Sequence, residues 1–527
     1  MARGRIEVIT GCMFCHRQGQ LILMANGSVK AVEEIQVGDH LISPEGTPIR
    51  VQVLHRGTGL MAEVRPCRGG DPFVVTLDHH LTLKSTSSVP GEKPSARGSR
   101  VVDVSVRDWL DWSSKRKSIF KLFRVGILAF TAPGLSSTAL DPYFLGVLLG
   151  DGSSDTRIGV TTTDPEIIRE VEQQALQYGL RVAYDAPKGK AQIVRLTGPS
   201  GKADPLADKL RDLGLYGLTG ANKFIPNCYL TASWQDRAAL LAGLLDTDGC
   251  SSDGAGFDFI NKSKHLADGV VFLTRSLGLA AHSQVCSKKA QTGPARQYHR
   301  VHIGGAVSLV PTRLPRKQLT RVVKHWPMTA FKVQVLPGTE PYFGFTVEGG
   351  HYLLGDFTVT HNSGKSEELV RRLRRSLIAK KRVKAFKHAS DDRYHKTHIG
   401  CHTGATFEAH PLKTVESIED HAHDFEVVGI DEAQFFDPSL ALMCERLANR
   451  GVRVIVAGLD LDSNANPFGP IPHLAVLAEE VIKLHAVCVV CGDEASRSFH
   501  LGHKEHQVEV GATQYEARCR ACWLPSE

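Results

Sequence analysis

The sequence predicts a multidomain chain in which an α/β domain with a parallel sheet is interrupted by an all-β insert, which itself hosts an α+β domain. Three observations indicate this. The chain has 527 residues, enough for three or four hydrophobic cores. Strand and helix patterns alternate when residues 1–14 and 363–527 are read as one segment. Two similar apolar, glycine-containing segments, 144–152 and 241–249, lie in the region between.

The outer domain is expected to start with an apolar strand at 6–10 and to continue with a helix at 366–380. Further strands are expected at 382–386, 427–430 and 452–457. Apolar strands alternating with helices are typical of a parallel sheet that is covered on both faces. Such sheets bind ligands at the carboxyl ends of their strands.

A phosphate-binding loop is expected after the first strand, but its sequence is in two pieces. Joined across the gap, the flanks read Gly-Cys-Met-Phe-Ser-Gly-Lys-Ser, which matches G-x-x-x-x-G-K-S. Neither half can bind a nucleotide alone, because the loop wraps consecutive backbone N–H groups around phosphate oxygens. The expected ligands of the ATP phosphates are Gly11, Cys12, Met13, Phe14, Ser363, Gly364, Lys365 and Ser366.

The segment between the two pieces begins with Cys15 and ends with His361-Asn362 before Ser363. A thiol next to the Phe14 carbonyl can convert the amide into a thioester, a serine can accept the acyl group, and an asparagine can cleave the last bond by cyclisation. These ends resemble those of an intein. The resemblance implies that the splicing residues are Cys15, Thr76, His79, His351, His361, Asn362 and Ser363. Gly344 stands where many inteins carry an aspartate.

Inside the insert, 144–152 and 241–249 resemble two copies of the LAGLIDADG motif of homing endonucleases. Small residues let two such helices approach, and each helix ends in a carboxylate, Asp151 or Asp248. Paired carboxylates can hold Mg²⁺ for cleavage of double-stranded DNA. The resemblance assigns Lys223 as a catalytic lysine, while a helix contact without activity stays an alternative. The basic stretch Arg313–Lys324, which contains Lys317, is expected to be a solvated face.

In the outer domain, Asp431-Glu432 follows an apolar strand. Asp431 is the expected Mg²⁺ partner together with Ser366, and Glu432 can take a proton from a substrate hydroxyl. The string from Asp431 to Phe436 resembles the Asp-Glu-x-Gln-Phe-Phe signature of type II thymidine kinases. That resemblance implies ATP-dependent phosphorylation of the thymidine 5′-hydroxyl, with Glu432 as base and Lys365 on the phosphates. Met13, Phe435 and Tyr515 would line the substrate pocket. The resemblance also implies that the spliced kinase forms a homo-oligomer, namely a tetramer.

Paired C-x-x-C sequences near the carboxyl end predict a structural zinc site. Its ligands would be Cys488, Cys491, Cys519 and Cys522, within a substrate-closing loop at 488–522. Related bacterial kinases usually show Phe-Arg where this chain has Ser463-Asn464. A relaxed deoxypyrimidine preference therefore stays an alternative to strict thymidine specificity.

The expected boundaries are 1–14 and 363–527 for the kinase, 15–137 and 311–362 for the splicing domain, and 138–310 for the endonuclease. No apolar run reaches the roughly 20 residues of a membrane span, so a cytoplasmic location is expected. The formal net charge of +7 is mild. Two other functions remain open: a nucleotide-binding module without kinase chemistry, and an insert whose DNA cleavage is the main activity.

Overall fold

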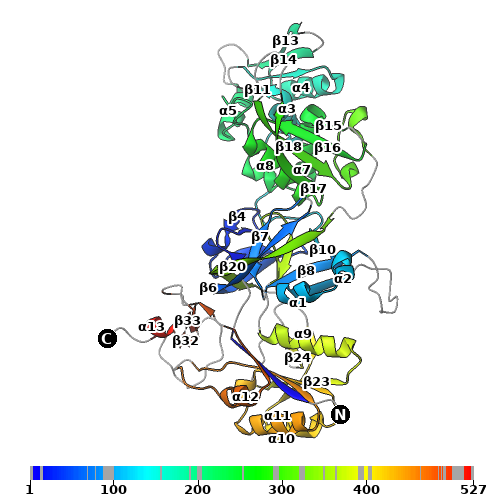
Figure 1. The fold of residues 1–527 in the computed structure, drawn as a ribbon. Helices are drawn as coiled ribbons and strands as arrows, with labels where there is room; N and C mark the ends of the chain where they lie inside the picture. The colour runs from blue at the N-terminus through cyan, green and yellow to red at the C-terminus, as the bar shows by residue number, and fades with distance from the viewer. Residues whose placement is uncertain are drawn as a thin grey trace.

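The computed structural model consists of three folded parts in a row (Figure 1). We call them the outer domain (4–11 and 365–523), the middle domain (16–124 and 327–361) and the inner domain (140–319). In Figure 1 the middle domain lies between the other two, and both chain ends lie in the outer domain. The structure describes residues 4–11, 16–67, 69–77, 79–86, 100–154, 157–188, 191–198, 204–251, 254–288, 296–319, 327–347, 350–361, 365–389, 397–400, 406–462, 465–484, 486–487, 490, 494–495, 497–500 and 515–523.

The outer domain is built on a parallel sheet with the strand order β26-β23-β27-β28-β1-β29. The first strand of the chain, β1, is an interior strand of this sheet, although the whole insert separates it from its neighbours. The strands are β1 (Arg5–Gly11), β23 (Val383–His388), β26 (His410–Leu412), β27 (Val427–Asp431), β28 (Arg453–Ala457) and β29 (Glu480–Leu484). The helices are α9 (Lys365–Ile378), α10 (Val415–Ala422), α11 (Ser439–Asn449) and α12 (Ile471–Leu477).

Two hydrophobic cores cover the two faces of this sheet, as the apolar strand patterns predict. On one face Ile6 and Val8 of β1 join a core with α10, α11 and α12. On the other face Ile9 joins a core with Leu369 and Leu373 of α9. Burying each aliphatic side chain of β1 stabilises the fold by about 1.5–3 kcal/mol. The sequence pattern of β1 alternates because successive side chains of a strand point to opposite faces.

The middle domain consists mainly of strands, as expected. Its main sheet has the order β20-β2-β7-β6-β5, with a further pairing of β20 and β6, and a second sheet has the order β19-β10-β8-β9. Two short helices also occur, α1 (Val106–Asp111) and α2 (Ser114–Ile119), each with a serine cap that accepts a backbone N–H. The strands are β2 (His16–Arg17), β3 (Leu21–Leu23), β4 (Val29–Ala31), β5 (His40–Ile42), β6 (Pro48–Pro66), β7 (Phe73–Thr76), β8 (His80–Ser85), β9 (Val101–Ser105), β10 (Phe120–Phe123), β19 (Met328–Thr329), β20 (Phe331–Val347), β21 (His351–Leu353) and β22 (Val359–His361).

The inner domain contains the same arrangement twice. Each half starts with a long helix and includes a four-stranded antiparallel sheet, of order β11-β12-β14-β13 in the first half and β15-β16-β18-β17 in the second. The elements are α3 (Pro142–Asp151), β11 (Gly152–Ser153), β12 (Gly159–Thr162), α4 (Pro165–Gln177), β13 (Arg181–Lys188), β14 (Ala191–Thr197), α5 (Pro205–Asp212), α6 (Asn227–Leu230), α7 (Trp234–Asp248), β15 (Gly249–Cys250), β16 (Gly256–Asn261), α8 (Lys264–Ser276), β17 (Ala280–Lys288) and β18 (Arg296–Gly304).

The chain leaves the middle domain and returns to it at neighbouring points. Strands β10 and β19 pair in antiparallel fashion, with Leu122 opposite Thr329 and Phe123 opposite Met328. The Arg124 N–H donates to the Pro327 carbonyl at 2.8 Å. Leu314, which lies beyond the expected end of the endonuclease at 310, belongs to the inner-domain core.

The carboxyl-terminal part of the outer domain has short strands and one helical turn. These elements are β30 (Ala486–Val487), β31 (Glu494–Ala495), β32 (Arg497–His500), β33 (Tyr515–Arg518) and α13 (Arg520–Trp523). None of the helices in the described part of the chain combines the length and apolar character that a membrane crossing requires.

Candidate functional sites

The strand and the helix that flank the divided phosphate loop lie together. Strand β1 ends at Gly11, and α9 begins at Lys365 and packs against β1, with Ile9 and Leu369 in one core. For Lys365 and Ser366 the structure describes the backbone only. The other expected loop residues, Cys12, Met13, Phe14, Ser363 and Gly364, lie outside the described residues.

The acidic pair lies at the carboxyl end of β27, and in the sheet only β28 separates β27 from β1. Asp431 is the last residue of β27 and is buried. Glu432 has a left-handed backbone with φ of +52°, which is uncommon for a residue with a side chain. Gln434 donates from Nε2 to the Glu432 carboxylate at 2.5 Å, and its own Oε1 accepts the Leu459 N–H at 3.0 Å. Gln434 therefore orients the carboxylate from a fixed position.

Aromatic rings line the region beside this pair. Phe435 lies in the 3₁₀ turn η4 (Ala433–Phe435), and its ring centroid is 5.8 Å from those of Phe468 and His388. Burial lowers the pKa of His388, so this ring is neutral near pH 7. Gly469 fits against the Gln434 carbonyl, where a Cβ would lie only 2.2 Å from the oxygen. Of the other expected substrate contacts, Met13 lies outside the described residues. Tyr515 is described by its backbone only; it lies in β33 and pairs with His500 of β32.

Two of the four expected zinc ligands are described. Cys519 is buried, and the backbone N–H of Cys522 donates to Cys519 Sγ at 3.4 Å. The Cys-x-x-Cys turn thus brings a backbone N–H to the sulfur of one cysteine, and cysteine sulfurs at this spacing are typical zinc ligands. This half of the donor set therefore fits a structural Zn²⁺ site. Cys488 and Cys491 lie outside the described residues.

In the middle domain, buried histidines gather next to the amino-terminal end of the insert. His79 Nε2 lies 2.8 Å from Thr360 Oγ1, and the His79 N–H donates to the Thr76 carbonyl at 3.0 Å. His16 Nε2 lies 2.6 Å from the Tyr352 hydroxyl, and the rings of His16 and His79 are 4.7 Å apart.

Burial lowers the pKa of His16 to about 3 and holds the pKa of His79 well below its usual value. Both rings are therefore neutral near pH 7. The second ring nitrogen of His79, Nδ1, is buried and has no hydrogen-bond partner among the described residues. It is thus available to a group that those residues do not include. Cys15 lies outside the described residues.

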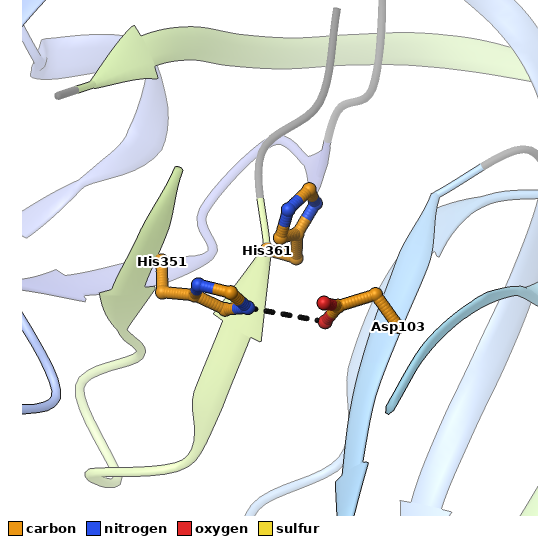
Figure 2. A group of neighbouring side chains, drawn as sticks. All are labelled: Asp103, His351 and His361. Carbon is orange, nitrogen blue, oxygen red and sulfur yellow. Dashed lines mark hydrogen bonds and ion pairs between the residues drawn. The ribbon is translucent and has the colours of Figure 1, made fainter. Parts of the chain in front are cut away.

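A second cluster lies at the carboxyl-terminal end of the insert, where β21, β22 and β9 meet. His351 Nε2 is 3.1 Å from Asp103 Oδ1, and the His351 and His361 ring centroids are 4.6 Å apart (Figure 2). Thr82 donates its hydroxyl to the same Asp103 oxygen at 2.7 Å. Burial alone would raise the pKa of Asp103, but the charges of His361 and His351 and the hydrogen bonds hold that pKa well below its usual range.

The ligand atoms of Asp103, His351 and His361 all lie within 4.8 Å of one another. These are donor types that bind transition metals. The same arrangement also suits proton transfer, because a carboxylate fixes the orientation and charge of an imidazole. Asn362 and Ser363, which follow His361, lie outside the described residues.

In the inner domain, α3 and α7 cross at two glycines. A Cβ on Gly146 would lie 2.3 Å from the Leu240 carbonyl oxygen, and one on Gly243 would lie 2.1 Å from the Tyr143 carbonyl oxygen. Only glycine permits this approach, which places the ends of both helices at one level. Asp151 and Asp248 are the last residues of those helices.

The charge of one terminal carboxylate, Asp248, opposes the ionisation of the other, Asp151. Although solvent reaches Asp151, partial burial of its carboxyl group and the charge of Asp248 raise its pKa to about 6. Burial also raises the pKa of Asp248, while Asn261 Nδ2 donates to it at 3.0 Å. A carboxylate whose ionisation is opposed by the charge of a second carboxylate marks a site in which a divalent cation would be stabilised.

At the carboxyl end of each of the two helices, α3 and α7, a lysine side chain donates to backbone carbonyls. Lys223 Nζ donates to the carbonyl oxygens of Leu148, Leu149 and Gly152 at 2.7–3.0 Å. Lys317 Nζ donates in the same way at the end of α7, to the carbonyls of Leu245, Asp246 and Thr247 at 2.6–3.2 Å. Both lysines are buried, and burial lowers the pKa of each. Each caps the carbonyls that a helix leaves without intrahelical partners.

Comparison with curated proteins finds close relatives of the outer domain. The thymidine kinase of Bacteroides thetaiotaomicron is 48% identical over 163 residues, which are 31% of this chain and 82% of the relative. The thymidine kinase of Rhodothermus sp. is 48% identical over 164 residues, 31% of this chain and 77% of the relative.

The chain belongs to the thymidine kinase family.

A family model described as Thymidine kinase matches residues 357–523 of this chain. A Hom_end-associated Hint model matches residues 15–133, and a model of a LAGLIDADG-like domain matches residues 235–310. The chain is a thymidine kinase with an intein that carries a homing endonuclease, so the three resemblances found in the sequence are confirmed.

Solved structures of the homing endonuclease I-DmoI are also similar to part of this thymidine kinase chain. A structure of mesophilic variants has a TM-score of 0.24 and 14% identity and covers 32% of this chain and 83% of that chain. A structure of I-DmoI in complex with DNA and Ca has a TM-score of 0.23 and 13% identity, with the same coverage.

Sequence reasoning missed two groups of this thymidine kinase precursor. Asp103 was not singled out, because its partner His351 is 248 positions away. The available signal was an acidic residue in the otherwise apolar stretch Val101–Val104. Lys317 was assigned to a solvated basic face, and this was wrong: the side chain is 7% exposed and caps α7.

Proposed function

We propose that the chain is a precursor that excises residues 15–362 and thereby joins the two parts of a thymidine kinase. The observation that carries this proposal is the position of β1. This strand lies between β28 and β29 in parallel register, and Ile9 near its carboxyl end shares a hydrophobic core with Leu369 of α9. Joining Phe14 to Ser363 at that edge would complete a phosphate loop between a strand and a helix.

The first splicing step would be an acyl shift at Phe14–Cys15. The Cys15 sulfur bonds to the Phe14 carbonyl carbon, the C–N bond breaks, and the thiol proton ends on the amine nitrogen. If Thr360 donates its hydroxyl to His79 Nε2, the proton of the neutral ring lies on Nδ1. That nitrogen, which has no partner among the described residues, would then donate to the departing amide nitrogen.

The later steps would occur at the other end of the insert. The Ser363 hydroxyl displaces the Cys15 sulfur, which leaves the acyl group as an ester on oxygen. The Asn362 side-chain nitrogen then bonds to its own carbonyl carbon, and the bond to the Ser363 nitrogen breaks, releasing a succinimide. Finally the free Ser363 amine attacks the ester and forms the peptide bond. His361 would polarise the Asn362 carbonyl, while His351, oriented by Asp103, would transfer protons beside it.

The joined kinase would transfer the γ-phosphate of ATP to the 5′-hydroxyl of thymidine. Lys365 would bind the phosphates, and Glu432, oriented by Gln434, would accept the proton of the hydroxyl. Ser366 and Asp431 would hold Mg²⁺, which neutralises phosphate charge when bound. Phe435 and Phe468 would pack against the base, and the cysteine pairs near the carboxyl end would hold a structural Zn²⁺.

The test compares three proteins: the full chain, the Cys15→Ala, Asn362→Ala double variant, and residues 1–14 fused directly to 363–527. Mass analysis of the full chain should show the excised insert and the joined kinase. The fusion should phosphorylate thymidine, and the double variant should stay intact and inactive, because its loop is interrupted. Ligated product in the double variant, or equal turnover by the double variant and the fusion, would refute the proposal.

A second function is favoured by the inner domain. The position of Asp151 and Asp248 at the ends of two crossing helices, with the charge of Asp248 raising the pKa of Asp151, supports metal-dependent cleavage of double-stranded DNA by this domain. The two carboxylates would hold Mg²⁺, which would stabilise charge on the phosphodiester. The substrate to test is DNA that encodes the uninterrupted phosphate loop. Asp151→Asn and Asp248→Asn should abolish cleavage and leave splicing unchanged; unchanged cleavage would remove both residues from the site.

A further inference from the structure

The groove between β28 and β29 is filled by the chain's own N-terminal strand. Among the described strands, β29 pairs with β1 alone, so β1 connects this edge strand to the rest of the sheet. Without β1, the facing edges of β28 and β29 would be about two strand spacings, or roughly 10 Å, apart. Their backbone N–H and carbonyl groups would then lack sheet partners, so the groove requires one extended segment.

Backbone pairing holds β1 along both of its edges. Arg5–Ile9 run in parallel register with Arg453–Ala457, and Glu7–Gly11 run with Glu480–Leu484. The amino-terminal end is bound as well: the Ile6 N–H donates to the Glu479 carboxylate at 2.7 Å, and the Glu479 N–H donates to the Ile6 carbonyl at 3.1 Å.

The side chains of β1 match the groove on both faces. Ile6, Val8 and Ile9 are at most 2% exposed, and they complete the two cores of the outer domain. Gly4, just before the strand, leaves no room for a side chain, because a Cβ there would lie 2.1 Å from the Ala448 carbonyl oxygen. The groove is therefore selective for shape as well as for an extended backbone.

A buried charge makes the groove specific for this segment. Glu7 is fully buried, and its carboxylate pairs with Arg453 of β28 at 2.6 Å and with Arg372 of α9. Arg372 also pairs with Glu480 at 2.9 Å. These hydrogen bonds and charges outweigh the effect of burial and lower the pKa of Glu7, so it is ionised at neutral pH. Removing β1 would leave the buried guanidinium group of Arg372 and the partly buried one of Arg453 without this partner, which is unfavourable.

We infer that the groove between β28 and β29 is a peptide-binding site for the segment 4–11, and that it keeps this segment bound after the chain is cut at Phe14–Cys15. Strand, core and ion-pair contacts hold the segment without help from the covalent bond to the insert. During splicing, the acyl group would pass from the Cys15 sulfur to the Ser363 oxygen while it stays covalently attached, and the groove would keep it close to this acceptor. The groove would make the same contacts if no splicing occurred, so the inference does not depend on that reaction.

The experiment uses the full chain with Cys15→Ala and Asn362→Ala, so that no splicing chemistry contributes. A site for a sequence-specific protease is inserted directly after Phe14, and a fluorescent label is attached to the N-terminus. After cleavage, gel filtration separates the label on the short segment from the large fragment. A run in guanidinium chloride verifies that the bond has been cut. The label should elute with the large fragment under native conditions.

Charge reversal then tests the recognition. Glu7→Arg places a further positive charge beside Arg5, Arg372 and Arg453, and the label should leave on the order of 100-fold faster. Glu426→Arg is the matched control, because Glu426 pairs with Arg382 at an exposed position of the same domain. It should retain the label as the parent does.

Two further measurements cover the case in which Glu7→Arg prevents folding. Glu7→Gln, which keeps the shape and loses the charge, should release the label faster than the parent. An unlabelled synthetic peptide of residues 1–14 should displace the label from the cut parent, whereas the same peptide with Glu7→Arg should not. Immediate loss of the label from the cut parent, or equal retention in parent, Glu7→Gln and Glu7→Arg, would overturn the inference.

Discussion

His351 and Asp103 are 248 positions apart in the chain, yet Nε2 of the histidine lies 3.1 Å from Oδ1 of the aspartate. Many inteins carry an aspartate at the position that Gly344 occupies here. In this chain a carboxylate from β9 reaches the histidine pair instead, and Thr82 holds it in place with a hydrogen bond of 2.7 Å.

The first prediction concerns this carboxylate. Asp103→Asn should slow cleavage at Asn362 by about 10–100-fold, because His351 loses the charge that orients its ring. The branched ester intermediate should accumulate on denaturing gels. Thr82→Val should act in the same direction with a smaller effect, and Asp111→Asn, on the exposed side of α1, should have none. Normal release of the insert by Asp103→Asn would exclude the proposed role.

The second prediction is a pH dependence of DNA cleavage. Because the pKa of Asp151 is raised to about 6, the carboxylate needed for Mg²⁺ is lost as the pH falls through that value. Cleavage at limiting Mg²⁺ should therefore fall steeply from pH 7 to pH 5. The folded domain disfavours ionised Asp151, so the stability of that domain without metal should decline as the pH rises from about 4 to 6.

Thermal unfolding and nicking rates across this pH range check both effects. In Asp151→Asn the stability decline should become smaller, and Asp248, whose pKa is also raised by burial, should account for part of what remains. Asp208→Asn, at an exposed pair with Arg211, should keep the parent's pH profile in both assays. A flat cleavage rate between pH 5 and 7 would contradict the assignment.

The third prediction concerns Lys317. Lys317→Met should destabilise the inner domain by about 2–4 kcal/mol, because three buried carbonyls at the end of α7 lose their charged donor. It should also reduce DNA cleavage about as much as Lys223→Met, since the two lysines hold equivalent positions. Denaturant unfolding and nicking assays measure these effects. Lys209→Met, which removes an exposed donor to one carbonyl, is the control.

The fourth prediction tests the helix crossing. Gly243→Ala should destabilise the inner domain by about 3 kcal/mol or more, because the new Cβ would lie 2.1 Å from backbone oxygen that cannot move away. DNA cleavage should be lost while splicing continues in the middle domain. Gly220→Ala, which meets no atom within 4 Å, should have little effect on either activity. Simultaneous loss of splicing in Gly243→Ala would show that the two domains fold as one unit.

Local sequence signals predicted the elements whose chemistry lies within a few residues. The alternation of Ile6 and Val8 predicted a strand, and Asp431 at the end of an apolar run predicted a site at a sheet edge. The two similar helices were predicted because glycine and a terminal aspartate recur at the same spacing. In each case the physical requirement is local and leaves a pattern in the sequence.

Contacts between distant segments leave no such pattern. Asp103 gained its role only when β9 packed beside β21 and β22. Lys317 and Lys223 are equivalent in space, but Lys223-Phe-Ile-Pro and Leu-Pro-Arg-Lys317 place the lysine and proline in opposite order, so no repeat is visible. The left-handed backbone of Glu432 was equally hidden, since Gln434 and the surrounding turn impose it.

The pairing of Leu122 with Thr329 has an evolutionary consequence. The chain leaves the middle domain after β10 and returns to it at β19, and these two strands are paired. The inner domain is therefore connected to the middle domain through two adjacent strands. If the insert excises itself as proposed, mutations that inactivate DNA cleavage would accumulate without loss of self-excision, while any mutation that blocks self-excision would also remove the kinase. Selection on the host gene would maintain the autocatalytic part and leave the mobile element that spreads it free to decay.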